Sequence, residues 1–307
     1  MSEAPGRITP LEELVSAFEF EAMAKRKLDS LTYARVQGAS RKPFERITLR
    51  PRVMVNTTKL DLTLELFGQR HFAPILIGPV SELKRFHPEG ELAMARGAAA
   101  AKALLVVSDH ASSPLEQIAP LCTAGFWYQV YADTDLARTR KAVAAGAKAV
   151  VVTLTSGGMD WAAIDRLRVG VQAPVVLKGI MSADEARMAV GKGVGGIVVS
   201  NYVDGPSDGL AHPLEVLPAI AEAVAGKIPV LMDGGLQRGA DMLKALALGA
   251  SAVLIARPAV WGLAGYGAEG VQRITEMLQT ELARDMAMCG KPNLKVVDRS
   301  VVRVHKW

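Results

Sequence analysis

The chain has 307 residues, half of them hydrophobic and only 5% aromatic, and its 36 basic and 31 acidic residues give a formal net charge of +5. The charges are mixed along the chain, without a basic patch interleaved with aromatic residues or a nucleic-acid-reading motif, so nucleic acid is not an expected partner. A chain of this length and composition can bury a large core of parallel strands under helices as one domain.

Two cysteines, Cys122 and Cys289, stand far apart without metal-ligand or redox spacing, which indicates buried thiols in a reducing compartment. The N-terminus lacks the basic-then-apolar pattern of a secretory signal, and no segment is apolar over the length that a membrane span needs. His71, His212 and His305 form no ligand spacing with carboxylates or cysteines. We therefore expect a cytoplasmic protein without a metal and without membrane contact.

The N-terminal and C-terminal parts flank a more regular centre. Residues 11–29 carry apolar side chains at helical spacing and predict one or two amphipathic helices. Residues 46–56 and 63–67 alternate like strands, which predicts a hairpin at the base of the fold. A Gly-Lys-Pro stop follows the last helical stretch, 267–288, and the remaining tail is expected to dock as strand or coil.

Between these parts, short β-branched runs alternate with Ala-rich helical stretches. The runs are 73–78, 104–108, 126–131, 149–154, 174–178, 196–200, 229–233 and 252–256. Eight such repeats predict an α/β fold, a closed (β/α)8 (TIM) barrel; an open doubly wound sheet is the alternative, although it seldom needs eight equivalent parallel strands. The expected single domain comprises an N-terminal helical extension with the base hairpin (1–72), the barrel (73–290) and a tail (291–307).

Each run ends in polar residues, at the barrel end where sites of this fold lie. These residues are Pro79-Val80-Ser81, Ser108, Gln129 and Tyr131, Thr153 and Thr155, Lys178, Ser200 and Tyr202, Asp233-Gly234-Gly235, and Ala256-Arg257. Strand ends can be polar merely because they meet water. A polar group after every strand, including a Lys and an Asp that close apolar runs, favours a functional site.

Two of these ends have a specific chemical interpretation. Gly234 and Gly235 offer unhindered backbone N–H groups, and Arg257 places a guanidinium after the next strand, so a phosphate site is predicted; a tight turn with a surface cation is the alternative. Lys178, at the barrel rim, suits an electron-rich ring or a developing negative charge, whereas a salt bridge to Asp233 would be a purely structural use.

Several longer segments carry a family resemblance. They are RITLRPRV (46–53), HPEGELAMARGAAAA (87–101), WYQVY (127–131), VLKGIMSADEA (176–186), GIVVSN (196–201) and MDGGLQRGADMLKALALGASAVLIARP (232–258). With them, the chain from about Phe18 to the C-terminal region resembles the FMN-dependent α-hydroxy-acid oxidase/dehydrogenase family, which includes glycolate oxidase, lactate oxidase and the flavin domain of flavocytochrome b2. An inosine-monophosphate-dehydrogenase-like barrel would need a cysteine after strand six, which this chain lacks.

The resemblance implies an FMN oxidoreductase with a small-molecule substrate, and by family analogy a homo-oligomer, tetramer or octamer. The flavin-contacting positions match: Pro79, Val80, Ser81, Ser108, Gln129, Thr153, Lys178 near the flavin N1/O2 edge, and Ser200. The positions for the ribityl chain and phosphate are Asp233, Gly234, Gly235, Ala256, in place of the family's glycine, and Arg257. Tyr131 matches the family's active-site tyrosine. These matches predict FMN as the cofactor.

The substrate side departs from the family pattern. Tyr202 stands where the family has its catalytic-base histidine, and Gly205 stands where an arginine holds the substrate carboxylate. Where the family has an aspartate that supports this histidine, this chain has Thr155. Where the family has a tryptophan after strand two, this chain has His110, and the family's N-terminal substrate tyrosine aligns with Arg35. The loop after strand four is also shortened, to 155–161, which leaves a wider mouth.

These departures argue against efficient oxidation of simple 2-hydroxy acids by the standard route. An unperturbed histidine titrates near neutrality whereas an unperturbed tyrosine is almost wholly protonated there, and loss of a general base typically costs about 10²–10⁴-fold. Three hypotheses remain. The enzyme oxidises a different or larger substrate with Tyr202, Tyr131 and Lys178 as catalytic groups; or it is a standard 2-hydroxy-acid enzyme in which His110 and Arg35 have taken over the missing roles; or it binds FMN without turnover.

Overall fold

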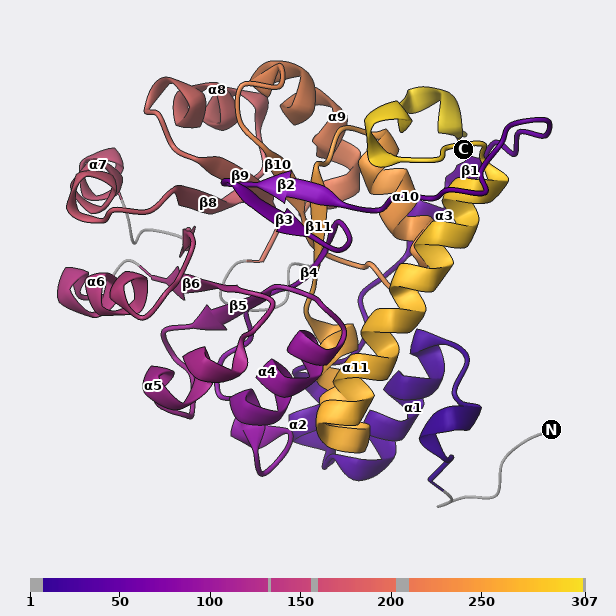
Figure 1. Ribbon diagram of the computed structural model, residues 1–307. Coiled ribbons are helices and arrows are strands. Elements are labelled where there is room, and N and C mark those ends of the chain that lie inside the picture. The colour runs from indigo at the N-terminus through magenta and orange to yellow at the C-terminus, as the bar shows by residue number, and fades with distance from the viewer. Residues whose placement is uncertain (1–7, 132–133, 156–159, 203–209, 306–307) are drawn as a thin grey trace.

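The computed structural model describes residues 8–131, 134–155, 160–202 and 210–305. Its centre is a closed barrel of eight parallel strands in the order β10-β11-β4-β5-β6-β7-β8-β9, with β9 pairing β10 to complete the ring (Figure 1). The strands are β4 (Ile75–Ile77), β5 (Leu105–Ser108), β6 (Phe126–Val130), β7 (Val150–Thr153), β8 (Val175–Ile180), β9 (Gly196–Val199), β10 (Val230–Met232) and β11 (Ala252–Ile255). The predicted (β/α)8 barrel is confirmed: seven of the eight apolar runs contain one of these strands, and β8 extends two residues beyond its run, 174–178.

A helix follows each barrel strand and packs on the outside of the ring (Figure 1). These helices are α4 (Gly90–Ala100), α5 (Leu115–Ile118), α6 (Leu136–Ala144), α7 (Trp161–Gly170), α8 (Ala183–Gly191), α9 (Pro213–Val224), α10 (Gly239–Ala247) and α11 (Arg257–Met288). Helix α11 is interrupted at Tyr266 and Gly267, whose backbone angles are not helical. The expected last helical stretch, 267–288, is therefore the second half of a longer helix. Short 3-10 turns lie at Leu83–Arg85, Ala119–Leu121, Leu294–Val296 and Arg299–Val301.

The N-terminal residues form a short 3-10 turn (Leu11–Glu13) and the helices α1 (Ala17–Lys27), α2 (Ser30–Ala34) and α3 (Lys42–Glu45). The Glu19 carboxylate accepts a hydrogen bond from the backbone N–H of Ser16 at 2.9 Å, which completes a capping box and fixes the start of α1. Phe20 and Met23 on the inner face of α1 are buried, and α1 packs on α11. The predicted helices at 11–29 are thus confirmed.

The predicted pairing of 46–56 with 63–67 is wrong. Strand β1 (Ile47–Leu49) pairs with the C-terminal strand β12 (Val302–Val304), and β2 (Leu64–Leu66) pairs with β3 (Gln69–His71). Phe67 and Gly68 both have positive φ, so a tight two-residue turn returns the chain at once and supplies β2 with a local partner. This hairpin closes the base of the barrel, where Phe67 lies 5.3 Å from the ring of Trp127. The tail was expected as strand or coil, and it includes the strand β12.

Inward- and outward-facing side chains alternate along the barrel strands, because successive residues of a strand point to opposite faces. The apolar side chains packed inside the ring are Leu76, Leu104, Val106, Trp127, Ala149, Val151, Val176, Val198, Leu231, Ala252 and Leu254. Their neighbours in sequence pack against the outer helices instead. Among the described residues, no helix is long and apolar enough to cross a membrane.

Candidate active site

The site follows from the alternation inside the barrel. In each strand, the position two residues after the last apolar side chain inside the ring also points inward, and it lies at the carboxyl end of the barrel. These positions are Gly78, Ser108, Gln129, Thr153, Lys178, Ser200, Asp233 and Ala256. Seven of the eight carry residues singled out from the sequence, so strand parity brings these predicted flavin positions to one end of the barrel.

Lys178 is the centre of this end. Its side chain is buried, and its Nζ atom lies 2.9 Å from both Ser200 Oγ and Asp233 Oδ2 and 4.9 Å from the centroid of the Tyr202 ring. The register of β8 shifts directly after Lys178, at Gly179, whose φ of +117° is unfavourable for other residues. This bulge sets the direction of the lysine. The salt bridge that the sequence left as an alternative use of Lys178 is therefore present, beside the tyrosine.

Gln129 provides a test of whether a flavin fits this end of the barrel. Its Nε2 atom donates to Thr153 Oγ1 at 2.8 Å, but its buried Oε1 atom accepts no hydrogen bond from the described residues. A buried acceptor without a donor costs about 1–3 kcal/mol, so such a group is expected to meet a ligand N–H. The edge of an isoalloxazine ring carries an imide N–H between two carbonyl groups, which suits this amide.

The loop after β10 suits the other end of the cofactor. Gly234 and Gly235 have φ values of +95° and +70°, and a Cβ atom at Gly235 would lie 3.1 Å from both Phe44 and His212. Arg257, at the start of α11, is partly buried, which lowers the pKa of its guanidinium, although an arginine stays charged. It donates to the carbonyl of Gln37 at 3.2 Å. A helix N-terminus, glycine N–H groups and a guanidinium together provide the chemistry of a phosphate site.

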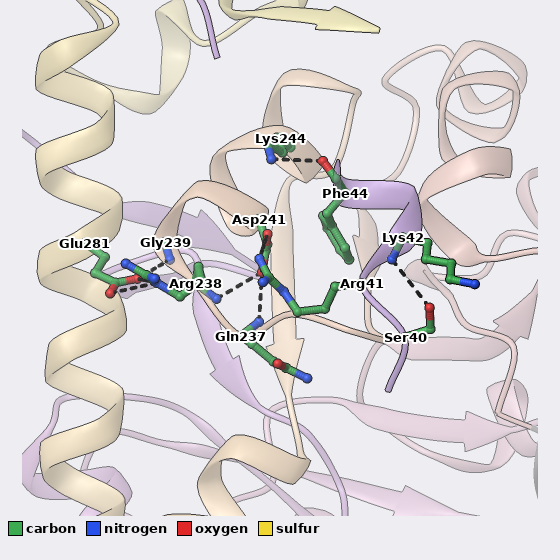
Figure 2. Close-up of polar contacts among 10 residues, drawn as sticks. All are labelled: Ser40, Arg41, Lys42, Phe44, Gln237, Arg238, Gly239, Asp241, Lys244 and Glu281. Atoms are coloured by element: carbon green, nitrogen blue, oxygen red, sulfur yellow. Dashed lines mark hydrogen bonds and ion pairs between the residues drawn. The ribbon is translucent and has the colours of Figure 1, made fainter. Parts of the chain in front are cut away.

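An ion-pair network fixes the N-terminal segment against this glycine loop (Figure 2). Arg41 pairs with the fully buried Asp241 at 2.7 Å, and Lys244 donates to the carbonyl of Phe44 at 3.0 Å. Asp241 also accepts from the backbone N–H groups of Gln237 and Arg238, and the Arg238 side chain pairs with Glu281. Residues 40–44 are thereby held over the glycine loop, whose backbone can be approached closely only because it lacks side chains.

Tyr131 and His110 form a second cluster at the same barrel end. Their rings are stacked, with centroids 4.6 Å apart and an interplanar angle of 15°. Ser81 Oγ lies 3.4 Å from the Tyr131 hydroxyl and 3.0 Å from Ser108 Oγ. An imidazole thus lies directly on the Tyr131 ring, and a cavity of about 810 Å³ adjoins this cluster along Ser81, Glu82 and His110.

Arg35 ends α2 at the mouth of the same region. The pKa of the Glu82 carboxyl is lowered chiefly by its hydrogen bond with Arg85, and the charges of Arg35 and His110 add smaller effects. Arg35 is exposed. Lys178 and Tyr202 form a separate cluster, in which the lysine lies over the tyrosine ring. Arg35 and His110 thus lie at one side of the site, around Glu82.

The remaining predicted positions are divided between the described and undescribed parts of the chain. Pro79 and Val80 lie in the loop after β4, Ala256 precedes α11, and Thr155 is partly buried after β7. Gly205 and most of the shortened loop at 155–161 lie outside the described residues. Within the described ranges, no group of three or more His, Cys, Asp or Glu residues is placed to hold a metal ion.

Sequence reasoning missed Asp109. It follows the inward Ser108, so it points to the helix side of the barrel, and its side chain is only 2% exposed. Its carboxylate accepts from the Tyr128 hydroxyl and, at 3.1 Å, from Thr134 Oγ1, and it pairs with Arg138 at 3.0 Å. An acidic residue adjoining the polar end of an apolar strand was the available signal.

Comparison with known proteins agrees with this geometry. A model of the FMN-dependent dehydrogenase family matches residues 13–156 and 153–304. A peroxisomal (S)-2-hydroxyacid oxidase of Arabidopsis thaliana is 33% identical, with 95% of this chain and 97% of that protein covered. An L-lactate oxidase of Nostoc sp. is also 33% identical, with 97% and 100% covered. A crystal structure of a mandelate oxidase with (S)-2-phenylpropionate has a TM-score of 0.90 and 32% identity, covering 96% of this chain and all of that one.

Proposed function

The chain belongs to the FMN-dependent dehydrogenase family, as an FMN-dependent oxidoreductase acting on CH–OH donors, and we propose that Tyr202 takes the place of a base histidine in its reaction. The observation that carries the proposal is the approach of the Lys178 ammonium to the Tyr202 ring, 4.9 Å from its centroid. A positive charge this close to the ring would stabilise negative charge that develops on the phenolic oxygen. Tyr202 is half exposed, at 50%, so a substrate can reach it.

Bound FMN supplies the two-electron acceptor, and the chain's own residues hold both ends of it. Gln129, Thr153, Lys178 and Ser200 would meet the ring system, and Gly234, Gly235 and Arg257 would bind the phosphate. Oxidation of a CH–OH carbon releases the hydroxyl proton, which needs an acceptor near that oxygen. Tyr202, as its phenolate, would take this proton, while the hydrogen on the same carbon would leave with its electron pair toward the flavin.

The substrate class that fits the proposal is a 2-hydroxy acid larger than lactate or glycolate. The cavity of about 810 Å³ beside Ser81 and His110 provides room for it. A mandelate oxidase is among the structural neighbours, and its bound (S)-2-phenylpropionate carries an aromatic ring. An aryl- or alkyl-substituted 2-hydroxy acid is therefore the first class to test.

A second candidate is oxidation of a simple 2-hydroxy acid with His110 as the base and Arg35 as the carboxylate partner. The specific observation in its favour is the stacking of His110 on Tyr131, which places an imidazole beside a matched active-site position. Stacking leaves the ring edge, with its two nitrogens, open toward a substrate.

The two candidates differ in which substitution slows flavin reduction. Anaerobic mixing of the holoprotein with 2-hydroxy acids would be followed by loss of the yellow flavin absorbance in Tyr202→Phe and His110→Gln. Under the first candidate Tyr202→Phe slows reduction by about 10²–10⁴-fold and His110→Gln has a small effect, because removal of a general base has that cost. The reverse pattern would establish the second candidate. Unchanged reduction in both variants would refute both.

We also propose that the chain forms a homo-oligomer through the face around β1 and β12. Val53 and Met54, just beyond β1, are 86% and 100% exposed, and apolar side chains so exposed commonly mark an interface. A groove of about 840 Å³ lies along β1 and β12, lined by Ile47 and Val302 among others. A second copy is the proposed partner. Light scattering should give a multiple of 32.7 kDa that Met54→Glu reduces; a monomeric wild-type chain would refute the proposal.

A further inference from the structure

We infer that Asp109 is a positioning residue: it holds the stacked His110 and Tyr131 rings at the substrate side of the barrel. The inference rests on the proposed function in that the reaction gives the pair its use. Asp109 itself lies behind the strand ends, on the helix side, and is 7% exposed. It therefore acts through its neighbours and not on the substrate.

Asp109 is connected to the backbone of both residues of the pair. His110 is the next residue in the chain, and its backbone N–H donates to Ser108 Oγ at 3.2 Å. On the other side, Thr134 Oγ1 donates to Asp109 Oδ2 at 3.1 Å and accepts from the backbone N–H of Tyr131 at 2.9 Å. A single carboxylate thus fixes the start of one loop directly and the start of the next through one threonine.

Two further groups hold the carboxylate itself. The Tyr128 hydroxyl donates to Asp109 Oδ1, and burial, together with this bond, raises the pKa of the phenol, so it remains a donor. Arg138 on α6 pairs with the carboxylate at 3.0 Å and also donates to the Asp109 carbonyl at 3.1 Å. Because β5 and β6 pair in register, the backbone N–H of Asp109 donates to the Gln129 carbonyl at 2.8 Å. These bonds leave the carboxylate one orientation.

The bonds around Asp109 are more than the two loops need in order to fold. A buried carboxylate is costly unless it is fully paired, and a threonine hydroxyl alone could accept the hydrogen bond from the Tyr131 N–H without a carboxylate behind it. The effect of these bonds is to couple His110 to Tyr131, since the backbone positions from which both rings project are fixed around the same side chain. Two rings that must meet one substrate benefit from such coupling, because a misplacement of about 1 Å can cost about 10²-fold in rate.

The test uses Asp109→Asn and Thr134→Val, with Asp165→Asn as the matched control. Asp165 pairs with Lys192 at 2.8 Å on the exposed surface, away from the site. The asparagine in Asp109→Asn can still accept the hydrogen bond from the Tyr128 hydroxyl, so we expect this variant to fold. It loses the ion pair with Arg138. The first readout is the NMR shift of the His110 ring protons, assigned by their loss in His110→Gln, because a stacked phenol ring moves them upfield.

We expect both variants to lose the upfield shift, and flavin reduction at saturating substrate to slow by about 10–10²-fold, while the Kd for FMN changes by less than about twofold. The control should match the wild type in all three. An unchanged His110 shift in both variants would overturn the inference, as would a rate loss no larger than that of the control. If no 2-hydroxy acid reduces the wild-type flavin, the proposed function fails, while the NMR shift still decides the role of Asp109.

Discussion

The pair of Lys178 and Asp233 gives a sharp prediction for Lys178→Met. The lysine is 4% exposed and the Asp233 side chain 17%, and their Nζ and Oδ2 atoms are 2.9 Å apart. Removing one partner of a buried ion pair costs about 3–5 kcal/mol, because the other charge is left in a poorly solvated place. Water reaches part of the Asp233 carboxylate, so we expect a loss of about 2–3 kcal/mol in the free energy of unfolding.

The matched control is Lys192→Met, since Lys192 Nζ lies 2.8 Å from Asp165 Oδ2 but both side chains are exposed. Exposed pairs contribute about 0–1 kcal/mol, so the control should lose no more than that. Both variants would be unfolded with urea in the absence of FMN. Adding Asp233→Asn to Lys178→Met should recover about 1–2 kcal/mol, because it removes the uncompensated charge. Equal losses for Lys178→Met and the control would refute the argument that burial decides the cost.

Three further predictions concern the cofactor, the histidines and the cysteines. Gln129→Leu should weaken FMN binding by about 2–10-fold in a fluorescence titration, which corresponds to the loss of one hydrogen bond, with little effect on the stability of the cofactor-free protein. An unchanged affinity for FMN would mean that the flavin edge does not meet Gln129. Burial lowers the pKa of both His71 and His212, so the unfolded chain binds more protons and stability falls as the pH drops below about 6.5; the urea midpoint should fall less in a His71→Gln/His212→Gln variant, and an equal fall would contradict this. Burial raises the pKa of the Cys122 thiol to about 12, so the native protein should resist iodoacetamide at pH 8 and react only after unfolding; rapid native labelling of Cys122 would contradict the buried position.

The barrel could be predicted because its evidence is local and repeated. Eight apolar runs, each followed by a helical stretch, specify a closed ring without knowledge of any long-range contact. The strand pairing outside the ring could not be predicted in the same way. Strand β1 meets β12, more than 250 residues later in the chain by the register of Ile47 with Val304, and nothing in either segment specifies the other. The turn at Phe67-Gly68, by contrast, was a local signal that was missed.

In the site, too, the residues on strands could be predicted and those that depend on loops could not. Ser108, Gln129, Lys178 and Ser200 could be placed together because each lies two residues beyond the last inward apolar side chain of its strand and so points to the same side of the sheet. The stacking of His110 on Tyr131 and the contacts of Asp109 with Thr134 and Arg138 depend on loop conformations and on α6, which no spacing in the sequence specifies. The loop-borne part of the site therefore lies where sequence patterns say least.

The most direct test of the account is anaerobic mixing of the FMN-loaded protein with a series of 2-hydroxy acids of increasing size, followed by the yellow absorbance of the flavin. We predict that the flavin is bleached, that larger 2-hydroxy acids bleach it faster than lactate or glycolate, and that Tyr202→Phe slows the bleaching. A flavin that light can reduce but that no 2-hydroxy acid bleaches would contradict it.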